Sequence, residues 1–329
     1  MFPPLSFLRR VGSARVRRIV WMAGVGMLML GGIAACREKA EGQAPLRGCV
    51  WRAWKPGVEG SLFLAGTIHI LRAEDYPLAP AYEAAYRQAD QVVLELPPGT
   101  GRSEVLARRM RERAALPHGR HLKDVISEDE WRRVEAWAAS QGMPVSAFSG
   151  FHPWYVSLVI VAVEYARLGA GPDHGVDHYY ELRAYEDGKP ASGLETMEFQ
   201  LDLFAEMTPQ QELDMLEQTL SEVERVKEDF AEMLRAWKSG DLDALDELLY
   251  REAEQYPELM DTFLKKRNQA WVPKLMKMTE GGKNVLVLVG AGHLGGKAGV
   301  LSLLRAQGCE IEHFTESGPV AMGSADVEE

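Results

Sequence analysis

The sequence predicts an α/β (α+β) fold in which β-α-β units at both ends of the chain form one sheet and a large helical insertion fills the middle. Two observations lead to this prediction. Short apolar runs rich in β-branched residues or leucine occur near both ends, and helix-forming stretches with start and stop signals lie between them. We expect a single domain over 49–316, followed by a small, acidic, disordered tail over 317–329.

The expected elements follow from local patterns along the chain. Strands are expected at 49–54, 62–70, 91–96, 191–194, 284–289 and 309–314. Helices are expected at 79–88, 103–115, 127–141, 153–168, 176–185 and 297–306, with a long helical stretch over 198–270. That stretch contains breaks near Pro209, Gly240 and Pro257. The helix at 127–141 begins with a capping box formed by Ser127 and Glu130.

A short pattern recurs near the two ends of the chain. One apolar run leads into Gly66-Thr67-Ile68-His69, and another leads into Gly290-Ala291-Gly292-His293. In both places a loop, a helix and a further strand follow. The glycine three positions before each histidine permits a tight exit from the strand, which a side chain would obstruct. We expect the two units to lie side by side in one sheet.

Composition excludes several classes of protein. The 329 residues include 48 acidic and 37 basic side chains, for a net charge of −11, and apolar residues make up 46%. Neither a disordered chain nor a protein embedded throughout in a membrane has this composition. Residues 1–35 contain five arginines and no acid and so carry +5, which leaves −16 on residues 36–329. With no basic stripe, nucleic acid is excluded as a ligand.

The first residues have the layout of a secretory signal. Five arginines precede the apolar run 19–35, and Ile33-Ala34-Ala35-Cys36 resembles the lipobox of bacterial lipoproteins. The resemblance implies that residues 1–35 are removed, that Cys36 is acylated and that 36–48 is a tether. Arg37 after the cysteine favours the outer membrane, facing the periplasm. The alternative is an uncleaved single-span anchor, because 17 apolar residues are near the lower limit for spanning.

Three cysteines exclude a disulfide-rich scaffold and every four-cysteine zinc module. Cys49 and Cys309 begin strand-like runs at opposite ends of the domain, and an exported domain lies where disulfides persist. We expect these two residues to pair and to tie the first strand to the last. The alternative is two unrelated buried thiols.

Three polar residues stand at the ends of apolar runs: His69, Glu95 and His293. In α/β sheets, ligands bind at the carboxyl ends of strands. A carboxylate such as Glu95 inside an apolar strand is costly unless it is paired, protonated or bound to a cation. The set suits a divalent metal with open positions for water, or a metal-free acid/base pair in which one histidine activates water. The plain structural alternative is that each histidine bonds a loop carbonyl and Glu95 pairs with an arginine.

A second histidine pair is a weaker candidate. His174 and His178 have the H-x-x-x-H spacing of a zincin helix, but Gly175 places His174 before the helix begins. We interpret both histidines as incidental and Asp177 as a carboxylate that stabilises the start of the helix.

Six short motifs occur in the order of a known family. They are Leu64–His69, the strand with Glu95, Gly175–Asp177, Gly193–Thr196, Arg267–Trp271 and Gly290–Leu294. Over about 49–314 the chain resembles the TraB/GumN proteins, which are related to Tiki and PrgY. The wider family is similar to erythromycin esterase and to the haem-binding lipoprotein ChaN.

The resemblance implies an activity and a site. Tiki members act as metal-dependent proteases through residues that correspond here to His69, Glu95 and His293, which would be both catalytic and metal-binding. It also implies that Arg267 positions a substrate or an oxyanion and that Glu195 and Asn268 bind substrate. A lipid-anchored, metal-dependent hydrolase of peptides or small molecules is therefore the leading expectation.

Two other functions stay open. One is a metal-free esterase-like hydrolase, with a histidine as the base and Glu95 orienting it. The other is a non-enzymatic haem- or metal-binding lipoprotein of ChaN type, although neither G-x-x-H loop contains a tyrosine.

Overall fold

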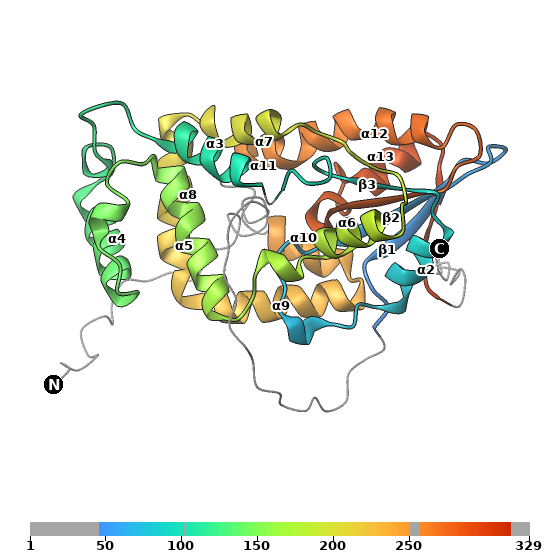
Figure 1. Cartoon of the computed structure of the whole chain (residues 1–329), viewed down its shortest axis with the longest axis horizontal. Coiled ribbons are helices and arrows are strands. Elements are labelled where there is room, and N and C mark those ends of the chain that lie inside the picture. The colour runs from blue at the N-terminus through green and yellow to red at the C-terminus, as the bar shows by residue number, and fades with distance from the viewer. Residues whose placement is uncertain (1–45, 102, 251–256, 317–329) are drawn as a thin grey trace, which may run out of the picture.

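The computed structural model describes residues 46–101, 103–250 and 257–316, with the side chains of 249, 250 and 257 left undescribed (Figure 1). The predicted signal peptide, the lipidation site Cys36, most of the tether and the predicted tail lie outside these residues. In the described part of the chain, no helix has the length and apolar character needed to cross a membrane.

A six-stranded mixed sheet forms the centre of the molecule. Its strands are β1 (Val50–Trp54), β2 (Leu62–Thr67), β3 (Gln91–Leu94), β4 (Ala191–Gly193), β5 (Val285–Gly290) and β6 (Glu310–His313). They lie in the order β4-β3-β5-β2-β1-β6. All six overlap strand ranges expected from the sequence, which confirms the predicted α/β class.

The strands β4, β3, β5 and β2 run parallel, whereas β1 pairs antiparallel with both β2 and β6. β2 is buried along its whole length and β5 at every residue except Gly290, as expected for parallel strands covered on both faces. Because the parallel strands share one direction, their carboxyl ends meet at one edge of the sheet.

The two β-α-β units share one sheet, as expected, but they interlock. The last long strand, β5, lies between β2 and β3, so the first unit is split by a strand of the second. The second unit in turn closes beyond β1, where β6 forms the edge. The chain crosses from β2 to β3 in one direction along the sheet and from β5 to β6 in the other, and Figure 1 shows α2 and α13 on opposite sides of the sheet.

Helices cover both faces of the sheet, and some of them form a helical region on one side of it. They are α2 (Pro80–Gln88), α3 (Glu104–Ala114), α4 (Glu128–Ser140), α5 (Pro153–Arg167), α6 (Val176–Glu186), α7 (Met197–Ala205), α8 (Pro209–Glu222), α9 (Val226–Ser239), α10 (Leu242–Tyr250), α11 (Pro257–Met260), α12 (Lys266–Met278) and α13 (Val300–Ala306). Figure 1 shows α2 and α6 near one face of the sheet and α12 and α13 near the other. A separate apolar cluster, which includes Leu122, Val134, Ile160 and Leu216, holds α4, α5 and α8 together.

The expected helix boundaries have identifiable causes. The Ser127 hydroxyl accepts from Glu130 N while the Glu130 carboxylate accepts from Ser127 N, which confirms the predicted capping box. Thr208 caps α8 in the same way. Gly240 ends α9 in the left-handed region at φ +71°, which favours glycine.

The predicted Cys49–Cys309 disulfide is not formed, and both thiols are free and buried. Each cysteine directly precedes a strand, and β1 and β6 run antiparallel, so the two residues lie at opposite ends of the strand pair. The Cys49 thiol packs beside Gly66, and the Cys309 thiol lies 3.5 Å from the Met276 sulfur. Burial raises the pKa of both thiols.

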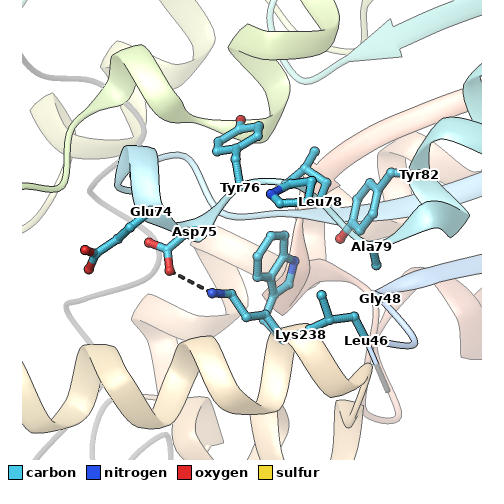
Figure 2. Close-up of a pocket in the computed structure, with 11 residues that line it drawn as sticks. Leu46, Gly48, Glu74, Asp75, Tyr76, Leu78, Ala79, Tyr82 and Lys238 are labelled. Atoms are coloured by element: carbon cyan, nitrogen blue, oxygen red, sulfur yellow. Dashed lines mark hydrogen bonds and ion pairs between the residues drawn. The ribbon is translucent and has the colours of Figure 1, made fainter. Parts of the chain in front are cut away.

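A hollow of about 190 Å³ lies between α9 and the segment that follows β2 (Figure 2). Leu46, residues 74–79 and the end of α9 form its walls.

Candidate functional site

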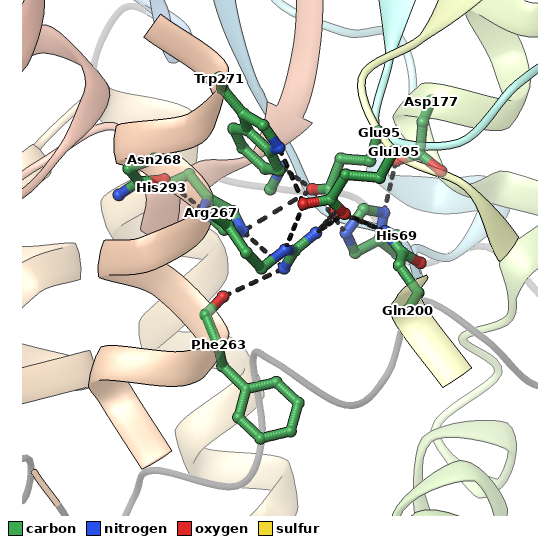
Figure 3. Close-up of polar contacts among 11 residues, drawn as sticks. His69, Glu95, Asp177, Glu195, Gln200, Phe263, Arg267, Asn268, Trp271 and His293 are labelled. Carbon is green, nitrogen blue, oxygen red and sulfur yellow. Dashed lines mark hydrogen bonds and ion pairs between the residues drawn. The ribbon is translucent and has the colours of Figure 1, made fainter. Parts of the chain in front are cut away.

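Four neighbouring parallel strands each deliver one acidic or imidazole side chain at the carboxyl edge of the sheet. Across the sheet these are Glu195 after β4, Glu95 after β3, His293 after β5 and His69 after β2. Figure 3 shows them converging on Arg267, which comes from α12. The structure therefore brings together every residue of the predicted site.

Glu95 lies at the centre of the cluster. Its Oε1 accepts the N–H of Gly290 at 2.8 Å, and its Oε2 accepts from Arg267 Nη2 at 2.6 Å and from Gln200 Nε2 at 3.3 Å. Burial alone would raise the pKa of Glu95, but Arg267 and the two histidines hold it well below its usual range. Glu95 is therefore an ionised carboxylate paired with Arg267, which is one of the three alternatives that the sequence left open for a buried acid.

His69 is held by a carboxylate from a different segment. Its Nδ1 lies 2.8 Å from Oδ1 of Asp177, in the first turn of α6. Gly175 allows this approach, because a Cβ there would lie 2.4 Å from the His69 carbonyl oxygen. Burial would lower the pKa of His69, but Asp177 and Glu95 raise it to about 9. At neutral pH His69 is thus an imidazolium that donates its Nδ1–H to Asp177.

The other ring nitrogen of His69 points into the site. His69 Nε2 is 3.7 Å from Glu95 Oε1, beyond hydrogen-bond length, and 21% of the His69 side chain is exposed. Within the described residues this N–H has no closer acceptor, so it is the group best placed to contact a reactant.

His293 has the opposite character. Its Nε2 is 3.1 Å from Arg267 Nη1, and its Nδ1 is 2.6 Å from Asn268 Oδ1. A guanidinium only donates, so Nε2 must accept and Nδ1 must carry the proton. Burial and Arg267 lower the pKa of His293 to about 3. The ring is therefore neutral and fixed in one tautomer, against Trp271 at 4.4 Å between centroids.

Arg267 is buried and uses all five of its N–H groups inside the protein. Nε and Nη2 bond the two oxygens of Glu195 at 2.9 and 2.8 Å, and Nη2 also bonds Glu95. Nη1 bonds the Phe263 carbonyl oxygen and His293. As the side chains lie, Arg267 is a positioning residue that aligns three others, because it has no donor left for a substrate carboxylate or an oxyanion.

Glu195 and Asn268 are also buried supports. Glu195 accepts from Trp271 Nε1 at 2.8 Å and from Gln200 at 3.0 Å, in addition to Arg267. Asn268 is fully buried and donates to the carbonyl oxygen of Ala298 while it accepts from His293. The substrate-binding role expected for these two residues stays a prediction. Their observed contacts hold Arg267 and His293 in place.

Gly290 leaves the space in which the three predicted residues meet. A Cβ at this position would lie 3.3 Å from His69 Nε2, 3.4 Å from Glu95 Oε1 and 3.6 Å from His293 Cδ2. A side chain would therefore crowd all three groups at once. This close approach explains the glycine of the second G-x-x-H pattern better than strand geometry alone.

Comparison with known sequences gives this arrangement a family. The profile of the TraB/PrgY/gumN family matches residues 49–313. The chain belongs to this family. No solved structure matches the chain significantly.

Among the curated members that the chain resembles is the uncharacterized protein YbaP of Escherichia coli (strain K12). The two are 26% identical over 242 residues, which cover 74% of this chain and 87% of YbaP, and YbaP of Shigella flexneri matches equally. Metalloprotease TIKI2 of Danio rerio is 20% identical over 86% of this chain, which spans only 64% of the length of TIKI2.

The name of TIKI2 raises the question of a metal ion in this TraB-family site. His69 Nε2 and His293 Nε2 are 3.7 and 3.9 Å from Glu95 Oε1, and all three atoms are of ligand types. However, His293 Nε2 already accepts from Arg267, and Glu95 Oε1 already accepts from Gly290. In the described ranges, no group of three or more His, Cys, Asp or Glu residues forms a metal site. As they lie, these side chains do not fit a divalent metal.

Sequence reasoning missed Asp177 and Gln200. Asp177 belongs to the family motif Gly175–Asp177, yet we interpreted it only as a helix-start carboxylate, because nothing local shows that α6 begins beside His69. The backbone bond from Val176 N to the Ile68 carbonyl oxygen, at 3.1 Å, makes this junction. Gln200 lies one turn into α7, and nothing in the sequence around it marks it as part of the site.

Proposed function

We propose that this TraB-family protein is a hydrolase of amide or ester bonds that uses His69, oriented by Asp177, for proton transfer. One observation carries the proposal: an imidazole anchored to a carboxylate at 2.8 Å presents its other nitrogen to Glu95 across a gap of 3.7 Å. The combination of a proton-transfer group and an orienting carboxylate is typical of general acid–base catalysis.

The proposed chemistry balances with water alone. Neutral His69 accepts a proton at Nε2 from a water molecule whose oxygen attacks the carbonyl carbon. The resulting imidazolium, stabilised by Asp177, then returns that proton to the leaving nitrogen or oxygen. Glu95 stays ionised and accepts a hydrogen bond from the second O–H of the water, and this bond orients the water for attack. The products are a carboxylic acid and an amine or an alcohol.

The pKa of His69, near 9, sets the protonation state in which the site works. At neutral pH only a small fraction of His69 is neutral, so the rate is expected to rise with pH until about pH 9. If His69 acted only as an acid, the rate would instead fall across that range.

Peptide bonds are the proposed target, and small esters are the second choice. The support is a distant relative: TIKI2, which is 20% identical to this chain, is named a metalloprotease.

A metal-dependent peptidase is the second candidate function. It is favoured by the ring nitrogens of His69 and His293, which lie 3.7 and 3.9 Å from Glu95 Oε1, three atoms of types that ligate metals. Metal binding would require Arg267 to give up its bond to His293.

The experiment is hydrolysis of a peptide library and of small aryl esters by the purified mature chain, with and without chelator. The variant is His69→Ala, and the control is His118→Ala, which changes an exposed histidine. Activity that resists chelation and is lost only in His69→Ala supports the proposal. Activity that requires metal supports the second candidate, and activity that survives in His69→Ala contradicts both.

We also propose that the protein is exported and anchored through Cys36 to the outer membrane, on its periplasmic side. The lipobox-like sequence before Cys36 is the support. Membrane fractionation of wild type and Cys36→Ser tests this: release of the variant into the soluble fraction is expected. Unchanged sedimentation with membranes would contradict lipidation.

A further inference from the structure

The hollow between α9 and the segment after β2 lies outside the candidate site but adjoins its framework (Figure 2). Tyr76 lines the hollow, donates its hydroxyl to the His174 carbonyl oxygen at 2.9 Å and contacts the Tyr179 ring at 5.5 Å. The hollow is therefore separated by one loop from the start of α6, where Asp177 holds His69.

The floor of the hollow is aromatic and apolar. Tyr82 and Trp237 are almost fully buried, with ring centroids 5.9 Å apart. Their polar atoms are already used, because the Tyr82 hydroxyl and Trp237 Nε1 both donate to the Gly66 carbonyl oxygen, at 2.6 and 2.8 Å. Both side chains can therefore offer a ligand a ring surface but no hydrogen-bond donor. Leu46 and Leu78 extend this apolar lining.

One wall of the hollow carries a cation with unused donors. Lys238 Nζ bonds Asp75 Oδ1 at 2.8 Å, and among the described residues its ammonium makes no other hydrogen bond. Asp75 also bonds Arg72, at 2.9 and 3.0 Å, and Arg72 in turn pairs with Glu74, another lining residue, at 2.7 Å. The two acids and two bases of this wall therefore balance, and Lys238 offers a ligand free donors rather than a net positive charge. An ammonium has three donors, so two remain for an acceptor on a ligand.

We propose that this hollow binds a small carboxylate with an aromatic or aliphatic body, whose anionic end contacts Lys238 and whose apolar end packs on Trp237 and Tyr82. A volume of about 190 Å³ accommodates roughly ten non-hydrogen atoms at the packing density of protein interiors. Asp75 offers a cationic ligand no free acceptor, because its two oxygens already accept four hydrogen bonds from Arg72 and Lys238.

The test is calorimetric titration of the mature chain with phenylacetate and with phenylacetamide, which has the same shape but no charge. Phenylacetate is expected to bind at one saturable site, at least about tenfold more tightly than the amide, because hydrogen bonds to charged groups are the stronger ones. Equal affinity of the two probes, or no saturable binding of phenylacetate, would overturn the proposal.

Variants locate the bound probe. Lys238→Gln is expected to lower the affinity for phenylacetate at least about tenfold, whereas Lys238→Arg keeps most of it. Lys227→Gln removes an exposed lysine from the same helix and should change nothing. Unaltered affinity in Lys238→Gln, or loss of binding in His69→Ala instead, would place the probe elsewhere and refute the assignment. If Lys238→Gln fails to fold, the arginine variant and the acid–amide comparison still decide.

Discussion

His69 and His293 end the same four-residue pattern on neighbouring parallel strands, yet they have opposite properties. His69 lies at the rim with its Nδ1 on Asp177 and a pKa raised to about 9. His293 lies beneath it, neutral, with both ring nitrogens bonded and a pKa lowered to about 3. One histidine is available to a reactant, and the other is part of the support.

The difference arises from which helix each histidine meets. The start of α6 gives His69 a carboxylate, whereas α12 gives His293 the guanidinium of Arg267 and the amide of Asn268. A motif of four residues therefore fixes where an imidazole stands at a sheet edge, but its protonation state is set by residues far away in the sequence.

The comparison predicts that His69 matters most for chemistry. Removing a general acid–base residue costs about 10²–10⁴-fold in rate, and His69→Ala is expected to lose activity on this scale. His293→Ala is expected to lose less, because it removes a support rather than the proton carrier. Rates at saturating substrate, with thermal melts as a check on folding, measure the contrast. Equal losses in the two variants would mean that both histidines act directly.

Arg267→Met tests the support beneath both histidines. The variant leaves Glu95 and Glu195 buried without their cation, which is expected to lower the free energy of unfolding by about 3–5 kcal/mol. Urea denaturation measures the change. Arg108→Met, at an exposed position in a long ion pair of 3.8 Å, is the control and should stay within about 0.5 kcal/mol. A similar small effect for Arg267→Met would show that the cluster is solvated.

Asp177→Asn is expected to make His69 resemble an ordinary histidine. Without the carboxylate the pKa of His69 should fall from about 9, by about one unit or more. NMR titration of the imidazole protons and the pH profile of the rate should shift together toward lower pH. An unchanged titration of His69 would contradict the pairing.

The two histidines should also affect the free energy of unfolding at opposite ends of the pH range. The pKa of His69 is raised, so its contribution is full below its ordinary pKa of 6.5 and is lost as pH rises through about 9. The pKa of His293 is lowered to about 3, so its contribution is full above 6.5 and is lost as pH falls below that value. Denaturation across pH should show the alkaline loss diminished in His69→Ala. A loss of the same size in His69→Ala and wild type would contradict this assignment.

Local sequence patterns were enough to predict the helices and strands and three residues of the site, His69, Glu95 and His293. Apolar runs marked β2, β3 and β5, and Ser127 with Glu130 marked a helix start, because these signals act within a few residues. The placement of β5 between β2 and β3 was not predictable, because strand order depends on long-range packing. For the same reason the sequence did not reveal that Asp177 meets His69, or that Cys49 and Cys309 end up at opposite ends of an antiparallel pair.

The position of β5 has a consequence for how the protein is made. Gly290 at the end of β5 bonds Glu95, 195 positions earlier, and β5 fills the gap between β3 and β2. Until β5 has been synthesised, β2 and β3 have no partner between them, and their unpaired edges are prone to aggregate. A chain that stops before β5 therefore has neither a closed sheet nor the Gly290 and His293 part of the candidate site.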